Sequence, residues 1–578
     1  MTHFRVWAPH SRSVDLIIGT ERIPLTPEAD GVFGGEVSSA VAGTDYAFSL
    51  DGSDPRPDPR SRCQPHGVHG PSRLVAEDSF AWTDQRWQPR PLASGVLYEI
   101  HVGTFTQEGT FDAATRRLDH LVDLGVTHVE LMPVAQFPGR WGWGYDGVDL
   151  FAPHQAYGGA EGLKRLVDAC HAQGLTVLLD VVYNHLGPSG NYLGAYGPYF
   201  TDRYRTPWGD ALNLDGPHSD RVRGFLIDNA LGWLEEYHLD GLRLDAVHAI
   251  VDTSAEHFLE ELADAIRTLE ARLGKRLVVT AESDLNDPRL IRAPVVGGYG
   301  LDAMWSDDIH HALHTVLTGE RTGYYADFGS IAQLAKALTL GIVYDGVYSH
   351  CRHRRHGRSI AGARGSELIA FIQNHDQVGN RARGDRLSHL VPTDRLKLGA
   401  GLLLTAPFVP LLFQGEEWGS SSRFPYFTDH SEPELAQAVR DGRLREFSAF
   451  GFRPEDLLDP QASSTFEQAK LDFGEIERAP HTEIFAWYKA LLALRRNVQD
   501  LSDDRLKRSS ARFDENEGWL VVQRGECLIA ANLCNSPVRI NLASGTRILA
   551  MASPAPPSTD GDAVVLAPWS IGIWVPAT

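Results

Sequence analysis

Four apolar runs in this 578-residue sequence end in a carboxylate, and three of these ends also carry a histidine or an arginine. Side chains alternate between the two faces of a strand, so we expect Arg243 and Asp245 to share one face. The Arg243 guanidinium would keep the neighbouring Asp245 carboxylate ionised and fix its orientation. The four ends are 180–185, 243–248, 281–284 and 373–376.

The carboxylates in these segments suit chemistry at a sugar. Glycoside hydrolysis uses one carboxylate held as an anion and a second carboxyl group that keeps its proton. Asp245 and Glu282 follow neighbouring strand candidates, so we expect their carboxyl groups about 5–5.5 Å apart, the separation typical of a retaining mechanism. Asp245 would act as nucleophile and Glu282 as acid/base, while Asp376 could hold sugar hydroxyls.

The elements that must position these residues alternate in type along the chain. Eight strand-like runs are separated by helical patterns, such as the apolar positions of 258–269 that Gly274 ends. This alternation predicts an α/β fold, a closed (β/α)8 TIM barrel with its functional groups at the carboxyl ends of the strands. A doubly wound open sheet is the alternative, but no glycine-rich dinucleotide fingerprint follows the first strand. The predicted strands are 96–105, 128–134, 175–182, 241–247, 277–281, 303–305, 368–372 and 409–413.

Three domains are expected. Residues 1–90 show short strand-like runs and predict an N-terminal β-sandwich, similar to a carbohydrate-binding module, which could bind glycan or serve as architecture. Residues 91–497 would form the barrel, with an inserted loop at 186–220 that is rich in aromatic residues. Residues 498–578 predict a C-terminal all-β domain.

Composition narrows the possible partners. The net charge of −21 disfavours nucleic acid and anionic membranes as partners but not a neutral sugar. The N-terminus lacks a signal-peptide pattern, and no apolar run approaches the ~20 residues of a membrane span. The five cysteines are odd in number and form no CxxC pair. We therefore expect a cytoplasmic enzyme that uses no metal ion or other cofactor; its oligomeric state is left open.

The four segments match, in type and order, the signature segments of the α-amylase superfamily, glycoside hydrolase family 13. The sequence resembles this family over almost its whole length, including both β regions. The resemblance implies that Asp245 is the nucleophile, Glu282 the acid/base, and Asp376 the third acidic residue that grips the sugar. Asp180 and Asn184 would support the site from the third strand.

The same resemblance implies a set of sugar-binding residues. Tyr145 would stack on the sugar at the cleavage site, where Arg243, His185 and His375 would also bind. Beyond the resemblance, an aromatic face in the inserted loop could stack on a pyranose ring, and we expect a side chain three residues past the nucleophile to face the leaving group. The expected substrate-binding residues are Tyr145, His185, Trp208, Arg243, His248 and His375.

Other segments bear on the branch of the family. Segments 97–106 and 143–148 look like the branching and trehalose-forming branch, and 185–201, 206–209 and 281–289 resemble most closely the members that release trehalose from a maltooligosyltrehalose. This implies hydrolysis of the α-1,4-glucosidic bond next to the terminal trehalose. A glycogen branching enzyme and an α-1,6 debranching enzyme are the alternatives, although segment 283–286 departs from both. An inert glycan-binding protein is disfavoured by the complete carboxylate set.

Overall fold

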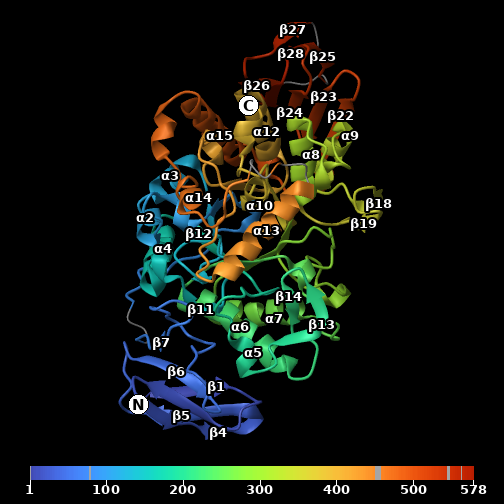
Figure 1. Cartoon of the computed structure of the whole chain (residues 1–578). Coiled ribbons are helices and arrows are strands. Elements are labelled where there is room, and N and C mark those ends of the chain that lie inside the picture. Colours follow the sequence, from blue (N-terminus) through green and yellow to red (C-terminus); the bar gives the residue numbers. More distant parts are fainter. Residues whose placement is uncertain are drawn as a thin grey trace.

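The computed structural model describes residues 2–76, 80–449, 453, 457–542, 547–560 and 563–577. Its centre is a closed barrel of eight parallel strands (Figure 1), which confirms the predicted fold class. In order around the barrel the strands are β12 (Thr176–Val181), β15 (Gly241–Leu244), β16 (Val278–Ala281), β17 (Ala303–Trp305), β20 (Leu368–Ala370), β21 (Val409–Phe413), β8 (Leu97–Ile100) and β9 (His128–Leu131).

The first barrel strand is shorter than the sequence pattern predicts. β8 ends at Ile100, and residues Val102–Phe105 form the short helix α1. The backbone amides of Thr104 and Phe105 both donate to the carbonyl of His101, which closes a helical turn. Every side chain of α1 is buried, and in a fully buried run a helical turn cannot be told from a strand by periodicity.

The barrel interior is apolar near the amino ends of the strands and charged further along. Inward-facing residues alternate, so Arg243 on β15 and Asp245 just past its end share the inner face. The register sets Asp180 of β12 beside Arg243, and Arg243 beside Thr280 of β16. An apolar cluster packs nearer the amino ends and includes Leu97, Leu178, Val278, Ala303, Ile369, Val409 and Leu411.

Amphipathic helices such as α7 (Phe258–Leu273) cover the outside of the barrel and bury their apolar face against it. In α7 the apolar positions are buried, the His257 side chain accepts from the Leu259 amide, and Gly274 ends the helix in a left-handed conformation. This confirms the predicted helix end. The other helices used below are α4 (Gly159–Ala172), α6 (Ser219–Glu236), α8 (Asp307–Thr318), α9 (Ile331–Leu340), α10 (His375–Gly379), α12 (Thr393–Thr405), α13 (Pro433–Ala449) and α15 (His481–Asn497).

The N-terminal region consists of two antiparallel sheets at one end of the molecule (Figure 1). Phe4 of one sheet packs edge-on against Tyr46 of the other, with ring centroids 5.0 Å apart. The sheets have the orders β1-β5-β4 and β3-β2-β6-β7. Their strands are β1 (Thr2–Trp7), β2 (Val14–Ile18), β3 (Glu21–Pro24), β4 (Thr26–Pro27), β5 (Val32–Val37), β6 (Asp45–Leu50) and β7 (Ser72–Arg73).

The inserted loop 186–220 packs mainly against this N-terminal region. It contains helix α5 (Leu193–Tyr196) and the hairpin β13 (Phe200–Thr206) and β14 (Gly209–Leu212). Tyr199 lies edge-on to Trp7, with ring centroids 5.2 Å apart, and the Tyr196 hydroxyl donates to the Pro57 carbonyl. These buried aromatic side chains therefore join two parts of the chain. Trp208, in the turn of the hairpin, remains 49% exposed.

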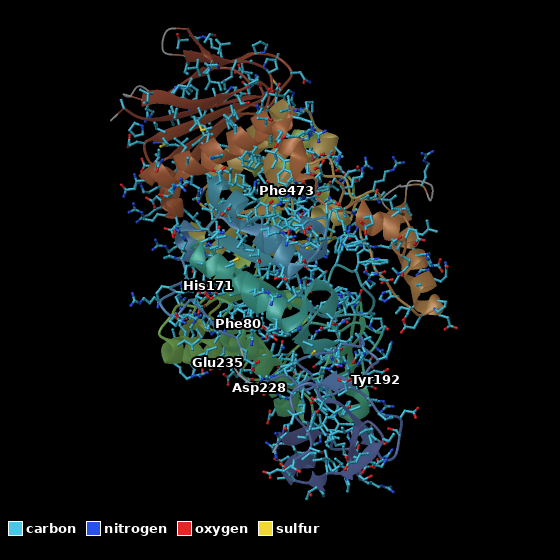
Figure 2. The ribbon with its side chains drawn as sticks, turned by 90° about the vertical axis from the view of Figure 1, so that its left-hand side faces the viewer. Phe80, His171, Tyr192, Asp228, Glu235 and Phe473 are labelled. Atoms are coloured by element: carbon cyan, nitrogen blue, oxygen red, sulfur yellow. The ribbon has the colours of Figure 1, made fainter. Side chains whose placement is uncertain are left out.

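The segments 51–71 and 80–95, between β6 and the first barrel strand β8, are here called the linker and run along the barrel. In Figure 2, Phe80 lies beside the helices that carry His171 and Glu235, which are α4 and α6. Arg60 of the linker pairs with Asp228 of α6 at 2.9 Å. These contacts fix the linker to the outer wall of the barrel, away from the strand ends that carry the predicted site.

The C-terminal region is all-β, as predicted, and lies at the opposite end of the molecule from the N-terminal sheets (Figure 1). Its sheets have the orders β22-β23-β24-β29-β26 and β25-β28-β27. None of the helices within the described ranges is long and apolar enough to cross a membrane. The C-terminal strands are β22 (Ser509–Asp514), β23 (Trp519–Arg524), β24 (Cys527–Asn532), β25 (Val538–Asn541), β26 (Arg547–Ser553), β27 (Ser558–Asp560), β28 (Ala563–Leu566) and β29 (Ser570–Pro576).

Candidate active site

A single buried guanidinium lies at the centre of the predicted site. Nη1 of Arg243 donates to Asp180 Oδ2 at 2.7 Å and to Asp245 Oδ1 at 2.8 Å. Its Nη2 lies 2.9 Å from Glu282 Oε2, and the group sits 4.4 Å from the centre of the Trp305 ring. Burial acts to lower the pKa of Arg243, but the surrounding carboxylates, Asp180 first, raise it well above its usual value. One cation thus brings Asp245 and Glu282 together.

The Asp245 carboxylate is held on both oxygens. Arg243 donates to Oδ1, and the Asn184 amide donates to Oδ2 at 2.7 Å and to the Asp245 carbonyl at 2.8 Å. The next residue, Ala246, has a φ of 37°, a strained value for a residue with a Cβ. Its backbone amide donates to Glu282 Oε2 at 2.9 Å. The turn after β15 therefore connects the two carboxyl groups directly.

A second buried charge pair lies beneath the site. The His375 imidazole lies 2.5 Å from Glu99 Oε1, and its Nε2 donates to the Tyr145 hydroxyl at 2.8 Å. Burial acts to lower the pKa of His375, but the charges of Glu99 and Asp376 and the hydrogen bond to Glu99 together outweigh it and raise that pKa to about 9. Tyr145 in turn donates to Asp180 Oδ2 at 2.6 Å, and burial raises the pKa of Asp180 to about 7. Near neutral pH, His375 is therefore a cation.

His185 and Trp208 form a stacked pair at the mouth. Their ring centroids are 4.2 Å apart and their planes differ by 5°. The Nε2 atom of His185 lies 3.1 Å from the Tyr145 carbonyl oxygen, and Nδ1 contacts the Asn184 side chain. Burial lowers the pKa of His185 to about 4, so this imidazole is neutral at neutral pH. Trp208 thus reaches the site from the inserted loop through contact with His185.

A cavity of about 720 Å³ opens above these residues. Eight of the nine predicted site residues line it, and Arg243 lies beneath its floor, fully buried. Asp376 lies at the start of α10, and burial followed by the charge of Glu282 raises its pKa, while His375 opposes that rise. The predicted residues in the lining are Tyr145, His185, Trp208, Asp245, His248, Glu282, His375 and Asp376.

This arrangement offers a nucleophile, an acid and hydrogen-bond donors within one cavity. Two carboxyl groups from neighbouring strands share one guanidinium, which suits acid-assisted nucleophilic substitution at a sugar carbon. Within the described ranges, no group of three or more His, Cys, Asp or Glu side chains is placed to hold a metal ion. The carboxylate separation and the role of each residue stay predictions.

Comparison with known proteins places the chain in a family. Models of the alpha amylase catalytic domain and of a domain of unknown function match residues 75–202 and 504–573. The malto-oligosyltrehalose trehalohydrolase of Mycobacterium tuberculosis is 48% identical over 561 residues, 96% of either chain. That of Arthrobacter ramosus is 49% identical over 542 residues, 93% of this chain and 94% of its own. The chain belongs to the malto-oligosyltrehalose trehalohydrolase family.

Members of this family are glycoside hydrolases of the α-amylase superfamily, so the chain is an enzyme of that class. A solved structure supports the architecture as well. A candidate alpha amylase from Salmonella typhimurium superposes with a TM-score of 0.90 at 38% identity, and the match covers 99% of this chain and 97% of the other.

The sequence pattern missed several residues of the site in this family member. Glu99 pairs with His375 across 276 positions, and its one signal was a charge inside an apolar run. Trp143 and Asp146 flank the predicted Tyr145, so their segment did mark them. Pro207 and Ala246 also line the cavity and lie within segments that the sequence marked. The rest of the lining comes from the turn after α10 and from the long segment after β21, where no motif pointed to the site: Asn380, Tyr426, Val439, Gly442 and Arg443.

Proposed function

We propose that this enzyme hydrolyses the α-1,4-glucosidic bond next to the terminal trehalose of a maltooligosyltrehalose, releasing trehalose and a maltooligosaccharide. The observation that carries the substrate assignment is the identity of 48–49% over nearly the whole chain with proteins named malto-oligosyltrehalose trehalohydrolase. The cavity supports the reaction type, because Asp245 and Glu282 both line it and both contact Arg243 beneath its floor.

The proposed reaction has two steps with net retention. Asp245 attacks the anomeric carbon, while Glu282 gives its proton to the leaving oxygen and trehalose departs. A water molecule, deprotonated by Glu282, then attacks the same carbon and releases Asp245 with the maltooligosaccharide. Arg243 contacts the carboxyl groups of Asp245 and Glu282 through both steps, and the Asn184 amide holds the second oxygen of Asp245.

The remaining predicted residues are proposed to bind the substrate. The His375 cation, whose Nε2 contacts the Tyr145 hydroxyl in the structure, would transfer that hydrogen bond to a sugar hydroxyl when substrate binds, and Asp376 would accept from neighbouring hydroxyls. Tyr145 and His185, which contact each other through the Tyr145 carbonyl oxygen, would both contact the sugar at the cleavage site. His248 and Trp208 would face the leaving trehalose, because His248 lies three residues past Asp245 and Trp208 covers His185.

One assay tests the proposed function. The purified enzyme is incubated with a maltooligosyltrehalose, with the linear maltooligosaccharide of equal length, and with amylopectin, and the products are separated by chromatography. Rapid release of free trehalose from the first substrate, at least about 100-fold faster than cleavage of the linear chain, is the expected result. Preferential branching or debranching of amylopectin would instead identify one of the two alternative activities.

The Glu282→Gln variant serves as the control for the chemistry. It keeps the size of the side chain and removes the proton donor, so we expect kcat to fall by about 10³-fold or more with substrate binding retained. Turnover at the wild-type rate would reject the acid/base role.

Two broader proposals accompany the function. The division into domains at residues 1–90, 91–497 and 498–578 is proposed from sequence composition, and the positions of the sheets support it. A cytoplasmic location is proposed because the chain is acidic and its five cysteines are unpaired in the structure.

A further inference from the structure

Helix α13 forms part of the catalytic cavity, although nothing in the sequence pattern pointed to it. It follows strand β21 and crosses the region of the barrel beside α10 (Figure 1). Val439, Gly442 and Arg443 of this helix line the cavity, together with Tyr426 of the segment that leads into it. One wall of the cavity is therefore built by an element far along the chain from the nucleophile.

Contacts at its base and middle hold the helix in this position. Glu432, the residue before α13, accepts a hydrogen bond from the Ser189 hydroxyl, and its carboxylate lies 3.3 Å from His69 Nε2. Further along, Arg440 Nε donates to Asp459 Oδ1 at 2.9 Å. The loop after β12 and the linker thus meet the base of α13, so the face that carries Arg443 is fixed against the cavity.

Arg443 reaches the predicted third acidic residue through one intervening side chain. Its Nη1 donates to Asn380 Oδ1 at 2.9 Å, and Asn380 Nδ2 donates to Asp376 Oδ1 at 3.3 Å. The guanidinium lies 4.0 Å from the centre of the Tyr426 ring. A planar cation stacked on a ring and hydrogen-bonded at its edge is well ordered, and such a group binds paired oxygen atoms well.

The barrel order indicates which part of the substrate meets this wall. The leaving trehalose must lie near Glu282, which protonates the departing oxygen, and therefore on the side of β15 and β16. Strand β21 lies across the closed barrel from these two strands, and β20 beside it carries Asp376 past its end. The glucose units on the other side of the scissile bond therefore extend past Asp376 and beneath α13.

We propose that α13 forms one wall of the glucan-binding part of the cleft. Arg443 binds the glucose units of the maltooligosaccharide that lie beyond the unit attacked by Asp245. The ligand is a neutral α-1,4-glucan chain, whose adjacent hydroxyl oxygens can accept paired hydrogen bonds from a guanidinium. Arg443 is thus a specificity-determining residue for chain length. This inference rests on the proposed function.

The test compares trehalose derivatives that carry one, two and three glucose units. For the wild-type enzyme we expect kcat/KM to rise with the second and third units, mainly through a lower KM. In Arg443→Gln this gain should shrink by about 10- to 100-fold, the effect of losing a charged hydrogen-bond donor. The readout is the ratio of kcat/KM between the three-unit and the one-unit substrate, so a general loss of folding or catalysis cancels.

Arg445→Gln is the matched control, because this exposed residue lies on the same helix but not in the lining of the cavity. Its ratio should equal that of the wild type. An unchanged ratio in Arg443→Gln, or a wild-type enzyme that shows no chain-length gain, overturns the inference while leaving the proposed function intact. Failure of the wild type to release trehalose from all three substrates overturns the proposed function itself.

Discussion

At the scale of single residues, the catalytic cavity rests on two buried cations that are each matched to carboxylates. Arg243 contacts Asp180, Asp245 and Glu282, and His375 pairs with Glu99. Buried charges are costly unless they are paired, so neither cation would be retained here without its partners. The second pair sets the protonation of a group that faces the substrate, which makes it open to measurement.

Replacing Glu99 by glutamine should shift the pH dependence of catalysis. Burial acts to lower the pKa of His375, and the charge and hydrogen bond of Glu99, together with the charge of Asp376, raise it to about 9. Without that charge, burial dominates, the pKa of His375 falls, and the cation is lost at lower pH. We expect the alkaline limb of the kcat/KM profile to move down by about one pH unit or more in Glu99→Gln.

Glu130→Gln is the control for that shift. Glu130 is equally buried, in the neighbouring strand β9, and burial together with the charge of Glu99 raises its pKa well above the usual value. Its neutral form is therefore favoured, and the substitution should remove less charge than Glu99→Gln does. Its alkaline limb should stay at the wild-type position; an equal shift in both variants would show that the effect comes from packing rather than from the Glu99 charge.

Residues at the strand ends could be predicted because two properties are visible in the sequence. These are the alternation of strand residues between the two faces and the order of the strands along the chain. Inward-facing positions of a parallel barrel meet at one end, so Asp245, Glu282 and Asp376 had to lie near one another once eight strands were identified. Glu99 differs, since its partner His375 lies far along the chain and no local pattern connects the two. A pairing of this kind follows from the closure of the barrel, where only β21 lies between β8, which carries Glu99, and β20, which precedes His375.

At the scale of elements, a buried charge cluster fixes the linker to the barrel. Asp84 of the linker lies 2.8 Å from His171 Nδ1 on α4, and His171 Nε2 lies 2.9 Å from Asp240. Trp87 stacks on the His171 ring at 4.6 Å and donates to Asp240 Oδ1 at 2.8 Å. Both carboxylates are almost fully buried, so they depend on the imidazolium between them.

His171→Leu should destabilise the protein by about 3 kcal/mol, because it leaves two buried carboxylates without their shared cation. Burial acts to lower the pKa of His171, but hydrogen bonds to Asp240 and Asp84 raise it overall. The contribution of His171 to the free energy of unfolding is therefore complete at pH values below 6.5, the pKa of histidine in the unfolded chain. It is lost as the pH rises through the raised pKa of the folded protein. Chemical denaturation from pH 6 upward should show the difference between variant and wild type narrowing.

His238→Leu provides the comparison. His238 also contacts Asp84, at 2.9 Å, but about a third of its side chain is exposed. Exposed pairs contribute about 0–1 kcal/mol, so this variant should lose little stability. If His171→Leu lost no more stability than His238→Leu, or if its loss of stability grew with rising pH, the charge cluster would not be what anchors the linker to the barrel.

Elements without a local signature were the hardest to predict. The helices and strands of the barrel follow from hydrophobic periodicity, as α7 shows with its buried stripe and its final glycine. The polar helix α13 has no such stripe, and its position depends on contacts such as Arg443 with Asn380 and Glu432 with Ser189. The aromatic residues of the inserted loop were visible in the sequence, but whether they face substrate or the N-terminal sheets depends on a domain contact that periodicity does not encode.

At the scale of the whole molecule, the acidic surface and the catalytic site are separate features. The net charge of −21 gives no attraction for a neutral glucan, whereas the charges that contact each other in and beneath the cavity come from five different barrel strands or their ends. The C-terminal β region is joined to the barrel far from those strand ends. Its junction packs α9 and α12 against the C-terminal strands and includes two buried arginines, Arg495 of α15 and Arg524 of β23.

These arginines satisfy the carbonyl groups at the end of α12. Arg495 donates to the carbonyls of Leu404 at 3.0 Å, Ala406 at 2.6 Å and Phe408 at 2.6 Å. Arg524 donates to the Thr405 carbonyl at 2.5 Å. Unpaired carbonyls at a helix C-terminus carry partial negative charge, so two guanidinium groups placed there are stabilising. This end of α12 leads into the amino end of β21, opposite the catalytic cavity.

Arg524→Met should therefore lower stability and leave catalysis intact. The Thr405 and Asp503 carbonyls would lose buried donors, at a cost of about 2–4 kcal/mol in the free energy of unfolding. Urea denaturation measures that loss, and kcat/KM at 25 °C should stay within about twofold of the wild type because the cavity lies at the other end of the strands. Lys507→Met, at an exposed position just before strand β22, should change stability by less than about 0.5 kcal/mol. A loss of kcat/KM in Arg524→Met without a loss of stability would instead mean that the junction of the C-terminal region acts on the catalytic site.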